Sequence, residues 1–301
     1  MKDLSIIIVN FNTKDFLINC LESLFTNISK NISCEVIIVD NNSNDGSIDA
    51  VKKILNNHSY LTLIENNENV GFSKANNIGI SKSTGEYILF INTDTIMKPD
   101  VLEAMFDFMN QTPNAGAATC LLRLPSGEID DATHRGFPTP WNAICYFSGI
   151  ARIFPKSMLF NGYNMGWKDM DKTHEIDALA GAFMMVKRKA GDEVGWWDED
   201  YFFYGEDLDF CYKLKQKGWK IYFVPSVEIL HYKGVSGGIK KESQHISKAS
   251  DETKLLATNA RFDAMKIFYR KHYRKSYPSI VTWIVLQGIG LKRRITLGEM
   301  L

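Results

Sequence analysis

A run of apolar residues that ends abruptly in polar ones, between Tyr87 and Thr95, constrains the fold of this chain most. Its core, Ile88–Ile91, shows no alternation of apolar and polar side chains. This pattern is typical of a strand buried on both faces, as in a parallel sheet. The polar triplet Asn92-Thr93-Asp94 follows at once, and ligands in open α/β sheets collect just beyond the carboxyl ends of strands. Asp94 is therefore expected either to hold a hard cation or to cap the next helix.

Similar apolar runs alternate with stretches of helical periodicity. Strands are predicted at 5–9, 36–39, 60–64, 88–91, 115–122 and 221–224, with another inside 176–186, and helices at 14–26, 48–55, 72–81, 101–109 and 206–217. This alternation predicts right-handed βαβ units. We therefore expect an α/β fold with a mostly parallel central sheet between helices, and a long ordered insertion at 125–171.

The composition is that of an ordinary globular protein. The chain has 301 residues, 45% hydrophobic and 23% charged, enough for one large domain or two modest ones. Its five cysteines are widely spaced and form no Cys-x-x-Cys pair, which predicts a reducing compartment and no zinc site. We expect no signal peptide at the start, and the apolar stretch 280–291 is too short to span a bilayer. The expected location is cytoplasmic.

The C-terminal part is strongly basic although the whole chain has a formal net charge of zero. Residues 254–294 contain ten Lys or Arg and one acid, Asp263. Apolar residues recur there at roughly helical spacing, and Trp283 lies nearby. A basic amphipathic extension at 237–301 is thus expected to contact the inner face of a membrane. The alternative is a solvated charged face whose apolar stripe packs on the rest of the protein.

Several side chains at or near predicted strand ends are candidates for ligand binding. Asp40 ends the second strand, where its carboxylate can accept the ring N–H of a pyrimidine, and Phe11 could stack on that base. Alternatively, Asp40 begins a polar turn and Phe11 belongs to the core. His231, beside Lys233 and Gly234, is equally compatible with a ligand and a structural role.

An acidic pair, Glu206 and Asp207, begins the last predicted helix after an aromatic segment. Acids are common in a first helical turn, where they interact favourably with the helix dipole. A carboxylate beside aromatic surface is also a plausible general base. Neither G-x-G-x-x-G after the first strand nor G-x-x-x-x-G-K-[ST] occurs, so dinucleotide-dependent dehydrogenases and P-loop enzymes fit poorly.

With these motifs in order, the chain resembles the family 2 glycosyltransferases, which have the GT-A fold. The resemblance covers roughly residues 4–236, and within the family the rhamnosyltransferase-like branch is most similar. The matching motifs are 5–12 (SIIIVNFN), 39–47 (VDNNSNDGS), 69–77 (NVGFSKANN), 92–94 (NTD) and 205–210 (GEDLDF), the last followed by His231. The resemblance implies a GT-A domain at 1–236, with a nucleotide-binding half at about 1–122 and an acceptor-binding half at about 123–236.

The resemblance also implies a role for each matching residue. The donor, a dTDP- or UDP-linked sugar, would contact residues of the first half: Phe11, Asp40, Lys74, Asn76, Asn92 and Asp94. Asp94 and His231 would hold Mg²⁺ or Mn²⁺, and Asp207 would be the catalytic base. Because the first acid of the metal motif is Asn92 here, a single carboxylate is left to hold the metal. Glu206, Trp197 and Tyr204 are expected to contact the acceptor, although core packing explains the aromatic residues equally well.

These roles imply an inverting, metal-dependent transfer of a sugar, L-rhamnose being one option, to a glycan or lipid-linked acceptor in cell-surface glycan synthesis. Two other classes stay open: a sugar-phosphate nucleotidyltransferase and a non-catalytic nucleotide-sugar-binding module. The presence of both Asp94 and Asp207 argues against the second. No nucleic-acid partner is expected, and a homodimer is an open alternative.

Overall fold

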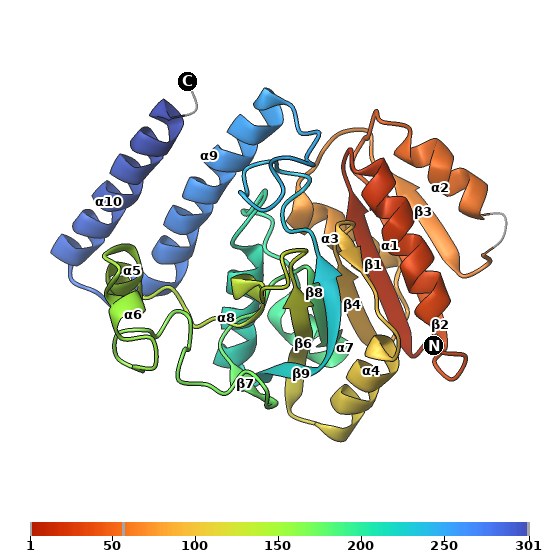
Figure 1. Ribbon diagram of the computed structural model, residues 1–301, viewed down its shortest axis with the longest axis horizontal. Coiled ribbons are helices and arrows are strands. Elements are labelled where there is room, and N and C mark those ends of the chain that lie inside the picture. The colour runs from red at the N-terminus through yellow and green to blue at the C-terminus, as the bar shows by residue number, and fades with distance from the viewer. Residues whose placement is uncertain (1, 56–57, 300–301) are drawn as a thin grey trace.

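One central sheet organises the computed structural model, which describes residues 2–55 and 58–299 (Figure 1). In that part of the chain the strand order is β3-β2-β1-β4-β8-β6-β9-β5, and β7 pairs with β9. The strands are β1 Leu4–Asn10, β2 Cys34–Asp40, β3 Leu61–Glu65, β4 Tyr87–Ile91, β5 Thr95–Ile96, β6 Ala115–Arg123, β7 His174–Ile176, β8 Phe183–Lys187 and β9 Lys220–His231.

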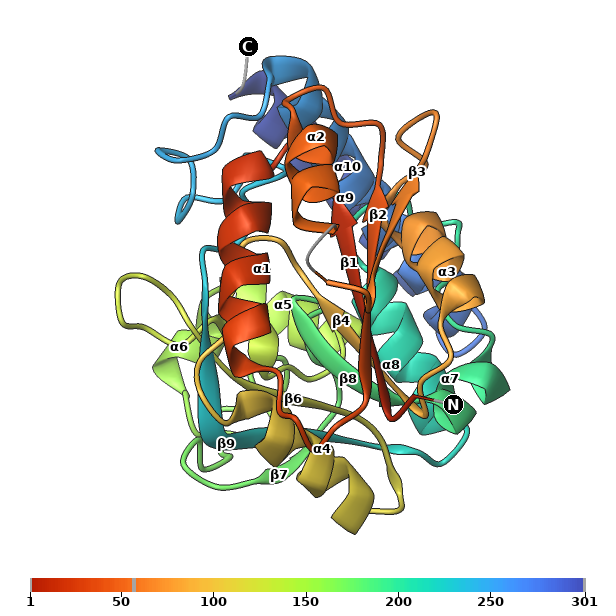
Figure 2. The same cartoon turned by 90° about the vertical axis from the view of Figure 1, so that its right-hand side faces the viewer.

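Helices cover both faces of the sheet (Figures 1 and 2). Buried side chains of α1, α2 and α4 form one core with the sheet, and those of α3, α7 and α8 belong to a second core on the other face. The bounds of these helices are α1 Lys14–Asn27, α2 Ser47–Leu55, α3 Phe72–Lys82, α4 Val101–Gln111, α7 Arg188–Val194 and α8 Glu206–Gln216.

The strand β4 lies at the centre and is buried on both faces, as its unbroken apolar run predicts. Leu89 and Ile91 point into the first core, whereas Ile88 and Phe90 point into the second. Successive side chains of a strand point to opposite faces, so a strand between two helical layers needs apolar residues at every position. The central strand predicted from the sequence is confirmed.

The order β3-β2-β1-β4 is parallel throughout, and the other half of the sheet is mixed. There β8 runs antiparallel to both β4 and β6, while β6 and β9 are parallel. The predicted α/β fold, a central sheet flanked by helices, is confirmed. The antiparallel β8 follows a long insertion, so no short crossover helix forces it to be parallel.

The strand β9 is longer than the sequence indicates because it continues through Pro225. Its register against β6 shifts there: Cys120 pairs with Val224, but the next residue of β6 pairs with Glu228. A bulge of this kind accommodates a proline that has no N–H for the ladder. The extended strand then brings His231 opposite Thr95 of β5.

The insertion and the C-terminal extension gather at the end of the molecule away from β3 (Figure 1). The antiparallel helices α9 and α10 lie side by side there, and α9 packs on the body through Phe262 and Phe268. No residue of α10 within the described range is buried. These elements are η1 Asp131–Thr133, α5 Pro140–Phe147, α6 Ile150–Ile153, α9 Asp251–Phe268, the π-helical turn η2 Tyr269–Tyr273 and α10 Ser279–Gly298.

The α9 packing revises the expectation for the extension, since part of its apolar stripe is used internally. His272 and Lys271 also pair with acids that flank the turn before α8, His272 lying 2.6 Å from Asp209 and Lys271 2.7 Å from Asp200. Across residues 2–55 and 58–299, no helix combines the length and the apolar character that a bilayer crossing needs.

Candidate functional site

A cleft opens at the carboxyl ends of β1 and β4. Parallel pairing sets Asn10 beside Asp40 at this edge, as expected for neighbouring strands that end at the same level. The second half of the chain and α9 supply the opposite wall, so the extension takes part in the cleft. Its lining includes Phe11, Asn41, Gly71, Asn92, Thr93, Asp94, Phe202, Phe203, Gly234, Gly237, Thr253 and Leu256.

Asp94 and His231 face each other at this edge because β5, which directly follows Asp94, pairs with the end of β9. The Oδ1 atom of Asp94 lies 3.5 Å from Nε2 of His231. The other oxygen accepts the backbone N–H groups of Gly234 and Val235, at 2.9 and 3.2 Å. Both side chains are buried, Asp94 being 4% exposed.

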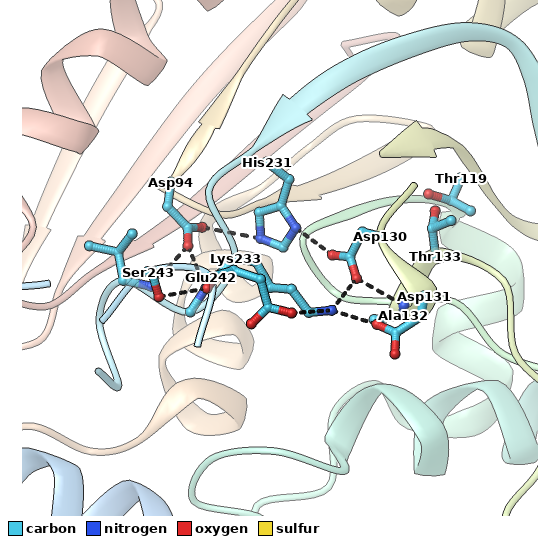
Figure 3. A network of polar contacts seen from close by, with 12 residues as sticks. Asp94, Thr119, Asp130, Asp131, Ala132, Thr133, His231, Lys233, Glu242 and Ser243 are labelled. Atoms are coloured by element: carbon cyan, nitrogen blue, oxygen red, sulfur yellow. Dashed lines mark hydrogen bonds and ion pairs between the residues drawn. The ribbon is translucent and has the colours of Figure 1, made fainter. Parts of the chain in front are cut away.

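A chain of charges continues behind this pair (Figure 3). His231 Nδ1 lies 2.7 Å from Asp130 Oδ2, and the other oxygen of Asp130 lies 2.8 Å from Nζ of Lys233. Asp131 and Glu242 also pair with Lys233. Lys233 is therefore held by three acids.

Neighbouring charges, opposed by burial, set the protonation states in this chain. Burial alone would lower the pKa of His231, but the charge of Asp94 and the hydrogen bond to Asp130 raise it to about 9. Burial alone would raise the pKa of Asp94, whereas His231 and the two backbone N–H groups hold it below its usual range. Without a metal, His231 is accordingly protonated at neutral pH and neutralises Asp94.

The pair has the properties of a two-ligand cation site. Nε2 of His231 is buried without a hydrogen-bond partner, and Asp94 and His231 would be the residues that hold a divalent cation here. Asp130 orients the ring from behind, as carboxylates do for metal-bound histidines. Within the described residues, no group of three or more His, Cys, Asp or Glu side chains could hold a metal. A bound diphosphate would therefore have to complete the coordination.

Asp207 lies at the start of α8, paired with an arginine from the insertion. One carboxylate oxygen lies 2.6 Å from Nη2 of Arg135, and the other accepts the N–H of Leu208 at 2.7 Å. The Asp207 side chain keeps 15% of its surface exposed. The carboxylate is thus oriented and still accessible, as a general base must be. It does not line the cleft, which the preceding Phe202 and Phe203 border.

Glu206 has a different environment from its neighbour. Its side chain is buried, and Oε2 has no hydrogen-bond partner. Burial and then the negative charge of Asp207 raise the pKa of Glu206 to about 8. Glu206 is accordingly a neutral acid at pH 7.

Replacing Glu206 by Gln is expected to change how stability depends on pH. The folded state binds more protons than the unfolded state between pH 4.5, the ordinary pKa of a glutamate, and about 8, so the stability of the parent falls as the pH rises through this window. Gln carries no titrating proton and mimics the neutral acid. The melting temperature of Glu206→Gln should therefore increase relative to the parent from pH 5 to pH 8. An equal difference at both pH values would contradict the assignment.

The expected donor-binding residues divide into two groups. Phe11, Asn92 and Asp94 line the cleft together. Asp40 reaches the same edge but is 1% exposed, and its two oxygens accept the Asn10 amide and the backbone N–H of Ser43, both at 2.7 Å.

Two further expected donor contacts lie away from the cleft lining, on α3. Lys74 is exposed, whereas Asn76 is buried and donates to the carbonyl of Phe72 within its own helix, at 2.9 Å. The structure therefore does not bring these two side chains together with Asp94.

The acceptor role expected for Trp197 does not fit the structure. Its ring is 2% exposed, stacks on Phe210 at 5.2 Å and packs edge-on against Phe90 at 4.8 Å. Trp197 is a core residue, and composition alone could not separate these roles. Tyr204 is half-buried, and its hydroxyl oxygen is buried without a hydrogen-bond partner.

Sequence reasoning missed Arg135, Asp130 and Asp131, all within the insertion. Asp130 lies 101 residues before His231, and Arg135 lies 72 residues before Asp207. No local pattern links residues so far apart. The only signal was an acidic doublet after a Pro-Ser-Gly turn.

The sequence comparisons identify the family. The model of the family described as "Glycosyl transferase family 2" matches residues 5–173, more than half of the chain. The rhamnosyltransferase WbbL of Escherichia coli is 28% identical over 236 residues, which cover 75% of this chain and 82% of that protein. The N-acetylglucosaminyl-diphospho-decaprenol L-rhamnosyltransferase of Mycobacterium tuberculosis is 27% identical over 246 residues, 78% of each chain.

Among solved structures, the fold is similar to a crystal structure of GalNAc-T7 with UDP, GalNAc and Mn²⁺. The TM-score is 0.59 at 16% identity, and the match covers 77% of this chain but only 44% of that one. This likeness shows the GT-A fold. Since the family model matches more than half of the chain, the chain belongs to glycosyltransferase family 2, and it is similar to the rhamnosyltransferases.

Proposed function

We propose that this glycosyltransferase moves a sugar from a nucleotide-diphospho-sugar to a hydroxyl of a lipid-linked or polysaccharide acceptor, with inversion at the anomeric carbon. The observation that carries the proposal is the Asp94–His231 pair in the cleft wall. A buried carboxylate and an imidazole nitrogen without a hydrogen-bond partner face each other there at 3.5 Å.

The donor would lie along the cleft, with its base near Phe11 and its diphosphate near Asp94. Asp94 and His231 would hold Mg²⁺ or Mn²⁺, which would offset negative charge on the departing diphosphate. Loading the site requires His231 to give up its proton, because only the neutral ring binds a metal. Asn92, next to Asp94 in the lining, can donate to a phosphate or sugar oxygen through its amide.

Asp207 would take the proton of the acceptor hydroxyl as that oxygen attacks the anomeric carbon. Arg135 fixes the orientation of the carboxylate through their ion pair. A single base and a single displacement from the face opposite the leaving group give inversion. Neutral Glu206 could donate a hydrogen bond to an acceptor oxygen, and Tyr204 could do the same through its hydroxyl group.

The relatives suggest the substrates. The names of the two rhamnosyltransferases specify the transferred sugar, and the mycobacterial name also specifies a diphospho-decaprenol acceptor. We therefore favour L-rhamnose from a dTDP-linked donor, with UDP-linked hexoses as the alternative. A lipid-linked acceptor would place the reaction in cell-surface glycan synthesis.

A thermal-shift panel of dTDP- and UDP-linked sugars, with and without Mn²⁺, tests the donor class. Binding at 100 times Kd should raise the melting temperature by ~5 °C. The largest shift should require both the nucleotide sugar and Mn²⁺. If no nucleotide sugar changes the melting temperature under either condition, the proposal is wrong.

The proposed location is the cytoplasmic face of a membrane, held by α10. This helix exposes Trp283, Lys292 and Arg294, and each basic residue near anionic lipid contributes about 1 kcal/mol. Deleting residues 279–301 should weaken flotation with anionic vesicles by at least about tenfold. α9 stays in place in this variant, so its donor affinity should match the parent's. Unchanged flotation would show that α10 does not bind membrane.

A further inference from the structure

Two cations between the cleft and the C-terminal helices lack a counter-ion. Near the site, acids pair with Lys233, with Arg135 and, at 2.9 Å, with Arg293. In contrast, Arg261 of α9 and Lys240 of the loop before it have no carboxylate within 4 Å anywhere in residues 2–55 and 58–299. Partly buried cations without a carboxylate in contact favour an anionic ligand.

Lys240 is connected to the cleft through an aromatic side chain. A Cβ atom built on Gly237, which lines the cleft, would lie 2.9 Å from the hydroxyl oxygen of Tyr204. Nζ of Lys240 lies 5.5 Å from the centre of the Tyr204 ring. The Lys240 stem also packs against Gly234, whose N–H binds Asp94. Lys240 is therefore next to the cleft wall, on the side that faces α9.

The charge of Arg261 acts on cations on both sides of it. Burial and then the Arg261 charge lower the pKa of Lys240. The same two causes lower the pKa of Lys292, on α10. Arg261 is thus near enough to Lys240 and to Lys292 for its charge to act on both, and an anion placed beside it would relieve the repulsion among these cations.

Apolar surface begins beside Lys292. Nζ of Lys292 lies 3.6 Å from the centre of the Phe147 ring, on α5. Beyond Phe147, the insertion exposes Ile153, Met158 and Leu159, each at least 60% accessible. The helices α5, α6, α9 and α10 lie at one end of the molecule (Figure 1). Exposed apolar patches of this kind mark interaction sites.

We propose that Arg261 and Lys240 bind the diphosphate of a lipid-linked acceptor, and that α5, α6 and α10 hold its hydrocarbon chain. This inference rests on the proposed function and specifies its acceptor. A guanidinium and an ammonium group suit a diphosphate, because each makes charge-assisted hydrogen bonds to its oxygens. A prenyl diphosphate combines the two chemistries of this surface in the order in which they lie. Its sugar would then extend toward Tyr204 and the cleft.

Direct binding of geranylgeranyl diphosphate to the full chain tests the inference. Saturating UDP and Mn²⁺ keep the donor cleft filled, so that the probe cannot bind there. Losing one charge-assisted contact should weaken binding by about tenfold or more, for Arg261→Gln and for Lys240→Gln alike. Arg270→Gln removes an exposed charge from the same extension and should bind like the parent. Unchanged UDP affinity in each variant shows that the fold is intact.

Two additional probes separate the diphosphate site from a general attraction to membranes. The affinity for inorganic diphosphate should fall in Arg261→Gln but not in the double variant Ile153→Gln/Leu159→Gln. That double variant should bind only geranylgeranyl diphosphate less tightly than the parent. Binding to phosphatidylglycerol vesicles should weaken as much in Arg270→Gln as in Arg261→Gln. The inference is overturned if Arg261→Gln and Lys240→Gln bind geranylgeranyl diphosphate like the parent, or if their affinity for it falls no more than that of Arg270→Gln. A parent that binds no UDP with Mn²⁺ would instead overturn the UDP arm of the proposed function, and a parent that binds no nucleotide at all would overturn the function itself.

Discussion

Asp207→Asn should slow sugar transfer by about 10²–10⁴-fold, the usual contribution of general acid–base catalysis. Asn keeps the shape of the side chain and can still accept the N–H of Leu208, but it cannot take a proton from the acceptor. Donor affinity should stay close to that of the parent, because Asp207 does not line the cleft. Nucleoside diphosphate release in the presence of acceptor measures the rate, and calorimetry measures donor affinity.

Glu206→Gln is the matched control for this experiment. Because the pKa of Glu206 is raised to about 8, Gln at pH 6.5 replaces a neutral acid of the same shape, and the rate should fall far less. Near-parental transfer by Asp207→Asn would mean that the base is another residue. Equal losses in the two variants would show that the pair acts as one unit.

Asp94→Asn should lower donor affinity in the presence of Mn²⁺ by at least about 100-fold. Replacing a residue that only orients a metal ligand typically costs 10–100-fold, and Asp94 would be the only carboxylate on the cation. Asn still accepts the N–H groups of Gly234 and Val235, so the edge of the sheet should keep its shape. Donor titrations of both proteins with Mn²⁺ and with EDTA provide the measurement.

With EDTA, the difference between Asp94→Asn and the parent should disappear, because the lost contact is to the metal. Mn²⁺ affinity of the parent should also rise as the pH increases toward 9, since His231 must lose its proton first. A difference that persists in EDTA would assign Asp94 to direct donor contact. Mn²⁺ affinity independent of pH would exclude His231 as a ligand.

The central strand and its polar end were predictable because they depend on local pattern. A strand buried on both faces must be apolar at every position, and Ile88–Ile91 satisfy this requirement. The carboxyl-edge rule then placed Asp94 and Asp40 at the same end of the sheet. His231 was harder to place, since the bulge at Pro225 carries β9 beyond the end that the sequence suggests.

The residues that support the site could not be predicted from spacing. Asp130 and Arg135 reach their partners only through the tertiary path of the insertion. For Trp197, the sequence suggested a contact that the structure does not have. Its aromatic neighbours were compatible with an acceptor surface, but these rings pack against one another in the core. The packing of α9 on the protein was one of two alternatives that the sequence left open, because an amphipathic pattern does not reveal whether its apolar face meets lipid or protein.

The most direct test of the proposed function is product analysis of a single reaction. Purified protein, Mn²⁺, a dTDP- or UDP-linked sugar and a diphospho-lipid acceptor are combined. NMR spectroscopy then gives the anomeric configuration of the new bond, and chromatography identifies the nucleotide product. We expect a glycosylated acceptor of inverted configuration and one nucleoside diphosphate for each sugar transferred. Pyrophosphate release or a retained configuration would contradict the proposed reaction.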